Sequence, residues 1–253
     1  MSVLDVRDVS VRFGGIVALD ELSFSVDRGE ICGLIGPNGA GKTTLFNVVS
    51  RIYQPTSGRL DFKDKEILDV PAHGIAKLGI ARTFQNLALF PRLTVLENVM
   101  VGAHSKTSVN FATAPLRIGV RREERRLQQE AMDILASLGL TAYALRPAMG
   151  LSYGTLKRIE LARAMAARPE LLLLDEPASG LTHSEVDELG QTIQHLRDEH
   201  ELTVLLVEHH MQLVMGISDK VVVLDFGRKI AEGRPEDVQN DPLVIEAYLG
   251  STT

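Results

Sequence analysis

A glycine-rich segment at residues 36–43 constrains the fold of this chain most. It reads Gly-Pro-Asn-Gly-Ala-Gly-Lys-Thr and fits the pattern G-x-x-x-x-G-K-[ST]. The apolar run Glu30–Ile35 before it predicts a strand covered on both faces, and Gly36–Thr44 predicts a loop that opens a helix reaching about Ser50. A buried strand, a loop and a helix in this order indicate an α/β core built on a parallel sheet.

The same segment predicts a phosphate site, because glycines let backbone N–H groups converge on an anion at the positive end of a helix. Lys42 would reach the β- and γ-phosphates of a nucleotide, and the Thr43 hydroxyl would ligate Mg²⁺. This pattern does not separate a kinase, a GTPase and a transporter ATPase. The nucleotide cradle is expected to comprise Gly36, Pro37, Asn38, Gly39, Ala40, Gly41, Lys42, Thr43 and Thr44.

A second candidate element ends in two carboxylates. The run Leu171–Leu174 is apolar and is followed by Asp175 and Glu176. A buried strand would deliver both to the carboxyl edge of the sheet, where ligands bind in α/β proteins. Asp175 would hold Mg²⁺ directly or through water, and Glu176 would orient or deprotonate an attacking water. The alternative is an acidic strand end paired with a nearby lysine or arginine.

A third element, Leu151–Thr155, begins another helix. Ser152 is predicted to be its N-cap, and Gly154 permits close backbone approach. Taken alone, this segment is typical of an ordinary capped helix, although its N-terminus is also a potential anion site.

Composition excludes several classes. The 253 residues fit one large α/β domain or two small ones, and 27 basic against 33 acidic residues give a net charge of −6. This balance excludes a polybasic nucleic-acid binder. The single cysteine, Cys32, allows no intrachain disulfide and no cysteine metal cluster, and it is expected to be an inert core residue. Apolar runs stay far below the roughly 20 residues of a membrane-spanning helix, and Met1–Phe13 has no signal-peptide apolar region.

The spacing of apolar residues divides the chain into a part before about residue 91, a helical part from about 91 to 168 and a part after it. Val3–Phe13 and Leu22–Val26 alternate with period two, with Val9, Val11 and Phe13 on one side, which predicts antiparallel strands with one wet face. From about 91 to 168 the spacing becomes helical. Further strands are expected at Arg59–Phe62, Lys65–Leu68, Ile80–Phe84, Leu171–Leu174, Val204–Val207, Val221–Leu224 and Arg228–Glu232, and helices at Leu93–Gly102, Arg122–Leu138, Leu156–Ala167 and Ser184–His200.

Over essentially its whole length the sequence resembles the nucleotide-binding subunit of ABC transporters. The ordered motifs are Walker A at Gly36–Thr43, the Q-loop glutamine Gln85, the signature Leu151–Thr155, Walker B at Leu171–Glu176, the D-loop Ser179–Thr182 and the switch histidine His209. The resemblance implies one ABC ATPase domain over residues 1–253. It implies a P-loop NTPase (RecA-like) core with an antiparallel β subdomain and an inserted helical subdomain at about 91–168.

Several segments are similar to the ATPases of branched-chain (hydrophobic) amino acid importers. They are Arg82–Asn86, Leu93–Asn98, the Leu-Ser-Tyr-Gly signature, Val207–His209, Gly227–Gly233 and Ile245–Gly250. Relatives that import urea, amides or other solutes share much of this pattern, so the solute stays open between these classes.

The resemblance also implies roles. Phe13 would stack on adenine, with an ordinary core aromatic as the alternative. Gln85 would sense the γ-phosphate or Mg²⁺, and His209 would hydrogen-bond the γ-phosphate. Two cassettes would sandwich two ATP molecules, with Ser152 and Gly154 of one chain completing the site of the other. The implied partners are a second ATPase subunit, membrane permease subunits and, indirectly, a periplasmic or extracellular solute-binding protein, at the cytoplasmic face of the inner membrane and without nucleic acid.

Three positions depart from the family pattern. Thr155 stands where the signature usually has glutamine, His210 stands where this subfamily usually has aspartate, and the D-loop ends in Thr182-His183. Two other classes remain as alternatives. A soluble ABC ATPase acting on DNA or ribosomes would carry long coiled coils or two cassettes, and a P-loop phosphotransferase would form a phosphorylated product and would not need Ser152, Gly154 or His209.

Overall fold

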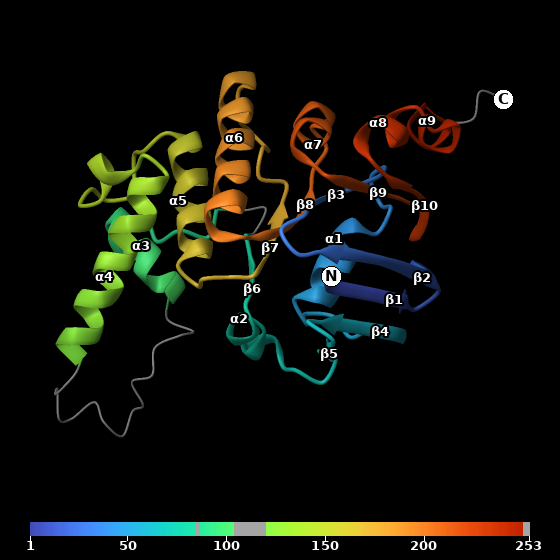
Figure 1. The fold of residues 1–253 in the computed structure, drawn as a ribbon, viewed down its shortest axis with the longest axis horizontal. Coiled ribbons are helices and arrows are strands. Elements are labelled where there is room, and N and C mark those ends of the chain that lie inside the picture. The colour runs from blue at the N-terminus through green and yellow to red at the C-terminus, as the bar shows by residue number, and fades with distance from the viewer. Residues whose placement is uncertain (84–86, 104–119, 250–253) are drawn as a thin grey trace.

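The structure, a computed structural model, describes residues 1–83, 87–103 and 120–249. Two sheets and their covering helices make up this part of the chain (Figure 1). The strands are β1 (Ser2–Phe13), β2 (Ile16–Asp27), β3 (Ile31–Ile35), β4 (Ser57–Phe62), β5 (Lys65–Glu66), β6 (Ile80–Arg82), β7 (Leu171–Asp175), β8 (Thr203–Val207), β9 (Lys220–Asp225) and β10 (Arg228–Gly233). The helices are α1 (Lys42–Val49), α2 (Ile75–Leu78), α3 (Val95–Gly102), α4 (Val120–Ser137), α5 (Tyr153–Met165), α6 (His183–His200), α7 (Met211–Ile217), α8 (Pro235–Gln239) and α9 (Pro242–Leu249).

The larger sheet has the order β10-β9-β3-β8-β7-β6 and is parallel except for β10. Strands β3, β7 and β8 are buried along their whole lengths, which confirms the strands expected from their apolar runs. Leu34 pairs with Val207 and Asp175 also pairs with Val207, so the carboxyl ends of these three strands lie side by side. The segments that follow them therefore meet at one edge of the sheet.

The smaller sheet has the antiparallel order β2-β1-β4-β5, as the alternation predicted. The residues on its solvent-exposed face are not all the ones that the alternation predicted. Val9 and Val11 are buried, but Ser10 is buried with them because its Oγ accepts the Glu21 N–H at 3.0 Å and the register of β1 shifts there. Phe13 is 45% exposed rather than sharing the buried side.

Several predicted boundaries were wrong. The second strand spans β2 rather than only Leu22–Val26, because pairing with β1 extends it through polar residues. Helix α5 begins at Tyr153, since capping by Ser152 starts it earlier than its apolar spacing suggests. Strands β5 and β6 end at Glu66 and Arg82; residues 84–86, which include Gln85, lie outside the described residues.

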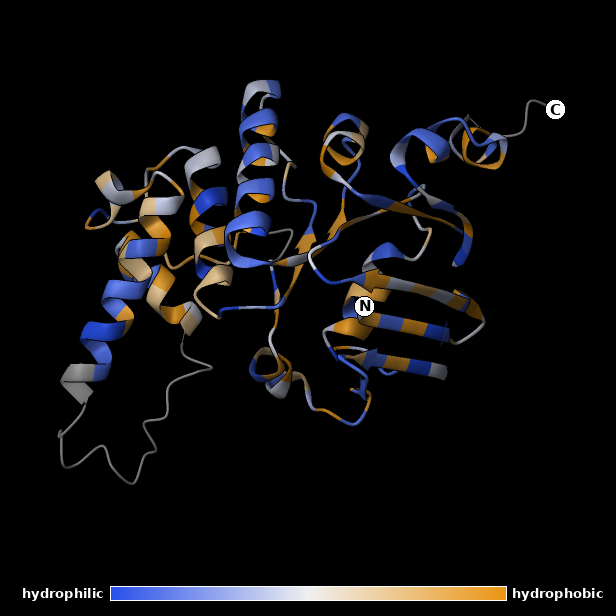
Figure 2. Cartoon of the chain, viewed as in Figure 1, coloured by the Kyte–Doolittle hydropathy of each residue, from blue (hydrophilic) through white to orange (hydrophobic). Residues whose placement is uncertain are grey.

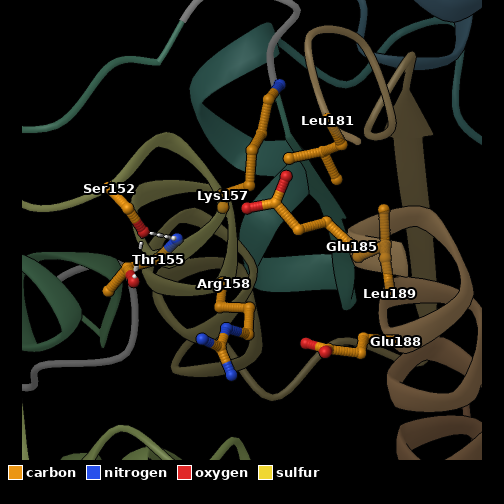
Figure 3. Close-up of a pocket in the computed structure, with 9 residues that line it drawn as sticks. Ser152, Thr155, Lys157, Arg158, Leu181, Glu185, Glu188 and Leu189 are labelled. Atoms are coloured by element: carbon orange, nitrogen blue, oxygen red, sulfur yellow. Dashed lines mark hydrogen bonds between the residues drawn. The ribbon is translucent and has the colours of Figure 1, made fainter. Parts of the chain in front are cut away.

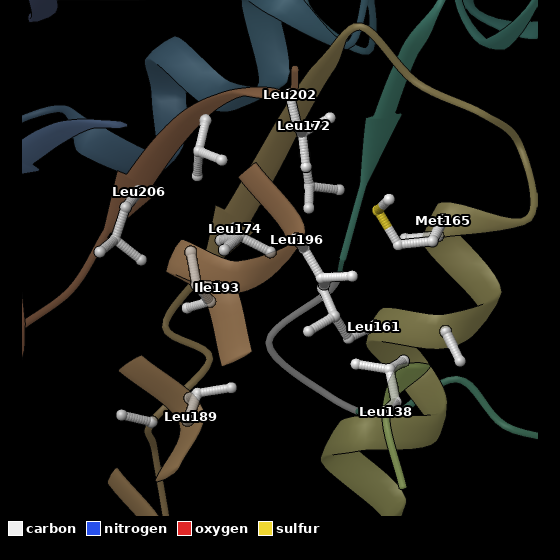
Figure 4. Close-up of a cluster of buried hydrophobic side chains, with 14 of the residues drawn as sticks. Leu138, Leu161, Met165, Leu172, Leu174, Leu189, Ile193, Leu196, Leu202 and Leu206 are labelled. Carbon is white, nitrogen blue, oxygen red and sulfur yellow. The ribbon is translucent and has the colours of Figure 1, made fainter. Parts of the chain in front are cut away.

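Helices α3, α4 and α5 pack together at one end of the molecule, and the described residues between 91 and 168 contain all three (Figure 1). Their core is continuous with that of the sheet. Figure 4 shows side chains of α5 and α6 meeting those of β7 and β8. The labelled residues are Leu138, Leu161, Met165, Leu172, Leu174, Leu189, Ile193, Leu196, Leu202 and Leu206.

Hydropathy follows this arrangement. Figure 2 shows the strands of the larger sheet as largely hydrophobic, while α4 and α6 consist mostly of hydrophilic residues. Among the residues that the structure describes, no helix is both long enough and apolar enough to cross a bilayer.

Candidate functional site

The glycine-rich loop turns tightly between β3 and α1. Gly36 and Gly41 have φ values of 150° and 102°. A Cβ on Gly36 would lie 2.1 Å from the Leu224 carbonyl oxygen, and one on Gly41 would lie 2.5 Å from the Ala18 carbonyl oxygen. Neither position tolerates a side chain, so the cradle depends on glycine for space as well as for backbone conformation.

Lys42 is buried at the first residue of α1. Its Nζ donates to the carbonyl oxygens of Gly36, at 2.7 Å, and Pro37, at 2.9 Å. Burial lowers the pKa of the Lys42 ammonium below its ordinary value, and the negative charge of Glu176 opposes this shift. The loop thus holds a desolvated cation at the sheet edge, which fits the binding of phosphate oxygens.

Asp175 ends β7 and is buried. Its Oδ2 accepts a hydrogen bond from Arg82 Nη2 at 2.7 Å, and its backbone N–H donates to Thr83 Oγ1 at 3.3 Å. Arg82 Nη1 also donates to Asn47 Oδ1, at 2.8 Å, within α1. The pairing that the sequence offered as an alternative to metal binding is therefore present, and Arg82 joins β6, α1 and β7.

The groups predicted to hold Mg²⁺ are oxygen donors, which suits that hard cation. Thr43, an exposed residue, offers a hydroxyl at the second position of α1, and Asp175 offers a carboxylate at the end of β7, on the same edge of the sheet. The residue types fit Mg²⁺. Gln85, the third predicted ligand, lies outside the described residues.

Glu176 and His209 meet at the ends of β7 and β8. His209 Nε2 lies 2.5 Å from Glu176 Oε1. The Glu176 N–H donates to the Val207 carbonyl oxygen at 2.8 Å, and Glu176 adopts φ = 48°, a left-handed conformation that aims its side chain out of the strand direction. Two residues 33 positions apart thus form one acid–imidazole pair beside the glycine-rich loop.

His210 lies elsewhere. Its ring stands edge-on to His183, at the start of α6, with 5.8 Å between centroids. Its buried Nδ1 has no hydrogen-bond partner among the described residues. Of the two adjacent histidines, His209 is the one whose ring lies against Glu176.

The signature segment caps α5 as predicted. Ser152 Oγ accepts the Thr155 N–H at 3.3 Å and lies 2.8 Å from Thr155 Oγ1 (Figure 3). A Cβ on Gly154 would lie 2.5 Å from Glu185 Oε1 of α6. Ser152 and Gly154 line a pocket whose other walls come from α5, Leu181 and α6, so the structure brings them beside α6 and not to the glycine-rich loop of the same chain.

Phe13 is an exposed aromatic rather than a core residue. Its ring packs edge-on against Tyr53, with centroids 5.2 Å apart and an interplanar angle of 72°. Phe13 is 45% exposed, so part of its surface is accessible to a planar group, which is compatible with the adenine role that the resemblance implied.

Sequence reasoning missed two residues at this site. In the sequence, Arg82 stands out only within the segment Arg82–Asn86, and Glu208 only within the segment Val207–His209. Glu208 is 3% exposed and accepts backbone N–H groups from two loops. Two features of the sequence could have identified these residues. Arg82 is an arginine near the end of a predicted strand, and Glu208 is a carboxylate directly after an apolar run.

A glycine cradle at the end of β3, with carboxylates at the end of β7 two strands along the same sheet edge, defines a class of protein. The chain is a P-loop nucleotide-binding protein.

Comparison with known proteins shows to which family of P-loop proteins the chain belongs. The model of the ABC transporter family matches residues 19–179, and that of the branched-chain amino acid ATP-binding cassette transporter matches residues 228–252. The high-affinity branched-chain amino acid transport ATP-binding protein BraF of Pseudomonas aeruginosa is 44% identical over 249 residues, 98% of each chain. The corresponding LivG protein of Escherichia coli is 43% identical over 252 residues, again 98% of each chain. This chain belongs to the ABC transporter family, as an ATP-binding subunit with ATPase activity.

Solved structures agree with the fold. An ATP-binding cassette of an ABC transporter in its ADP conformation is 32% identical and superposes with a TM-score of 0.87, covering 99% of this chain and 100% of that one. A dimeric bacterial ABC transporter cassette, 24% identical, shares the fold with a TM-score of 0.77 over 92% of this chain and 98% of that one. The predicted α/β P-loop fold is confirmed.

Proposed function

We propose that this chain supplies the energy for an importer of branched-chain amino acids by hydrolysing ATP. The solute class is supported by the names of BraF and LivG and by the match of the C-terminal segment. The observation that carries the hydrolytic role is the 2.5 Å contact between Glu176 and His209 beside Lys42.

The reaction is an in-line attack of water on the γ-phosphorus of ATP. Glu176 takes the water proton as the new O–P bond forms and the bond to the bridging oxygen breaks, which leaves ADP and phosphate. His209 fixes the Glu176 carboxylate through its Nε2, while Lys42 balances the charge on the β- and γ-phosphates. Thr43, Asp175 and Gln85 would hold Mg²⁺, which supplies further positive charge against the phosphate oxygens.

Binding of the nucleotide involves two chains in this proposal. The backbone of Gly36–Thr44 cradles the phosphates and Phe13 stacks on adenine. Ser152 and Gly154 of a second cassette cover the γ-phosphate, because these residues lie beside α6 of their own chain and stand at a helix N-terminus. A cassette of the same fold has been solved as a dimer, which is compatible with a site shared by two chains.

A permease is the proposed membrane partner, which would keep the chain peripheral at the cytoplasmic face of the membrane. A groove of about 540 Å³ runs between the sheet core and the helical layer. Its walls include Ile52, Phe90 and Val101, three apolar side chains with exposed surface. Such a surface suits a short amphipathic helix. Val101→Arg should abolish stimulation of ATPase activity by the permease and leave the activity of the isolated chain intact, with Val17→Arg, on β2, as control.

ATPase assays on purified variants test hydrolysis. Glu176→Gln should lower kcat at least about 100-fold with an ATP Kd close to that of the wild type, and His209→Ala should act in the same direction. His195→Ala is the matched control, because His195 is also exposed and contacts a glutamate, Glu199, at 3.2 Å. Unchanged kcat in Glu176→Gln, or transfer of phosphate to a second substrate, would reject the proposal.

The solute is tested by uptake. The chain, reconstituted with its permease and binding protein in vesicles, should drive ATP-dependent accumulation of labelled leucine, isoleucine or valine. Accumulation of urea or short amides without these amino acids would assign the transporter to the other class of relatives.

A further inference from the structure

Glu208 is a buried carboxylate between β8 and His209, and no role has yet been given to it. It is 3% exposed. Within the described ranges no lysine, arginine or histidine forms an ion pair with it. An ionised carboxylate in such a place needs strong hydrogen bonds to offset its lost hydration.

Those hydrogen bonds come from backbone groups of two segments. Oε1 accepts the Ala178 N–H at 2.6 Å, and Oε2 accepts the N–H groups of His209 at 2.8 Å and His210 at 3.0 Å. Ala178 lies in the turn between β7 and α6, whereas the two histidines follow β8. One side chain therefore ties the segment after the Walker B carboxylates to the segment that carries the switch histidine.

The neighbouring contacts show which group the Glu208 carboxylate holds in place. Glu176 is fixed to β8 by its own N–H, which donates to the Val207 carbonyl oxygen, and its carboxylate meets the His209 ring. His209 is half exposed and has no helix or strand to hold its backbone. The Glu208 carboxylate, anchored at Ala178, supplies that missing restraint.

We infer that Glu208 is a positioning residue for hydrolysis, which holds the His209 backbone so that its ring meets Glu176. The inference deepens the proposed function and rests on it. Charge-assisted hydrogen bonds are about twice as strong as neutral ones, and misplacement of a catalytic group by about 1 Å can cost about 100-fold in rate. Replacing the Glu208 carboxylate by a neutral group should therefore lower kcat, because the His209 ring would no longer be held against Glu176.

The test variant is Glu208→Gln, which keeps the shape but presents an amide NH₂ to N–H donors. We expect kcat to fall about 10- to 100-fold, with an ATP Kd within about twofold of the wild type. In a double-mutant cycle with His209→Ala, Glu208→Gln should add less than about a twofold loss, because both changes remove the same interaction. Glu124→Gln, at an exposed glutamate of α4, is the matched control.

A spectroscopic readout separates positioning from general structural support. The ¹⁵N resonance of His209 Nε2 should move in Glu208→Gln as its contact with Glu176 is lost. A kcat unchanged in Glu208→Gln, losses that multiply in the double variant, or an unmoved resonance would overturn the inference. If the wild type proves not to hydrolyse ATP while the resonance still moves, then the proposed function fails and the positioning of His209 stands.

Amide hydrogen exchange in the wild-type chain covers the case in which Glu208→Gln does not fold. The N–H groups of Ala178 and His209 should exchange far more slowly than those of an open loop, because both donate to a buried carboxylate. Exchange at the rate of an unprotected loop would contradict the geometry on which the inference stands.

Discussion

Replacing Arg82 by methionine tests whether the Walker B aspartate depends on a buried cation. Arg82 Nη2 lies 2.7 Å from Asp175 Oδ2, with side chains 10% and 6% exposed. Arg82 Nη1 also donates to Asn47 Oδ1 in α1, at 2.8 Å, and to Ser50 Oγ at the C-cap of α1, at 3.2 Å. Arg82→Met would leave the Asp175 carboxylate buried opposite an apolar side chain.

The expected cost follows from the burial. Removing one partner of a buried ion pair destabilises a protein by about 3–5 kcal/mol. In a chain of this length each kcal/mol lowers Tm by about 2–4 °C, so Arg82→Met should melt about 6–20 °C below the wild type. Arg126 is the control, because its side chain is 58% exposed and lies 3.4 Å from Glu123; Arg126→Met should cost no more than about 1 kcal/mol.

Urea unfolding followed by far-UV circular dichroism measures both variants, in the absence of nucleotide and divalent metal so that ligand binding does not shift the midpoint. Adding Asp175→Asn to Arg82→Met should recover part of the loss, because a neutral amide is cheaper to bury than a carboxylate. The reasoning is refuted if Arg82→Met unfolds within about 1 kcal/mol of the wild type, or if the second change lowers stability further.

Three further predictions concern titratable groups. Burial lowers the pKa of Lys42 below 10.5, so in alkaline solution the unfolded chain binds more protons than the folded chain. The free energy of unfolding of the wild type, relative to that of Lys42→Met, should therefore increase as pH rises toward 10.5. Lys42→Met should also lose ATP binding in a fluorescent-nucleotide titration. The Thr182 N–H and hydroxyl donate to the Glu185 carboxylate and lower its pKa. In urea unfolding, the wild type should therefore be more stable than Glu185→Gln above about pH 4.5, and this difference should vanish as pH falls through the lowered pKa. Burial raises the pKa of the Cys32 thiol, so Cys32 should react with a thiol reagent only after denaturation; rapid native labelling would contradict its placement in β3.

Local patterns predicted the parts of the fold that depend on neighbours in sequence. Gly36–Thr43 and the run ending at Asp175 could be identified because each motif is contiguous and its strand is apolar throughout. The Ser152 cap was also predicted, since capping involves only the next three residues.

The remaining features depend on contacts between distant residues. Arg82 and Asp175 are 93 positions apart, and Glu208 and Ala178 are 30 apart, so no local pattern reveals their pairing. The exposure of Phe13 and the burial of Ser10 likewise follow from the register between β1 and β2, which shifts at positions that alternation cannot locate. The lack of space for a side chain at Gly154, next to Glu185, depends on how α5 packs against α6.

The central claim is that nucleotide binding joins two copies of the chain through Ser152 and Gly154. Light scattering of Glu176→Gln tests it most directly, because blocking hydrolysis should trap the joined state. With MgATP the mass should double from 27.7 kDa, whereas MgADP, absence of nucleotide, or addition of Ser152→Ala should leave it unchanged. A mass of one chain under all conditions, although ATP binds, would contradict the claim.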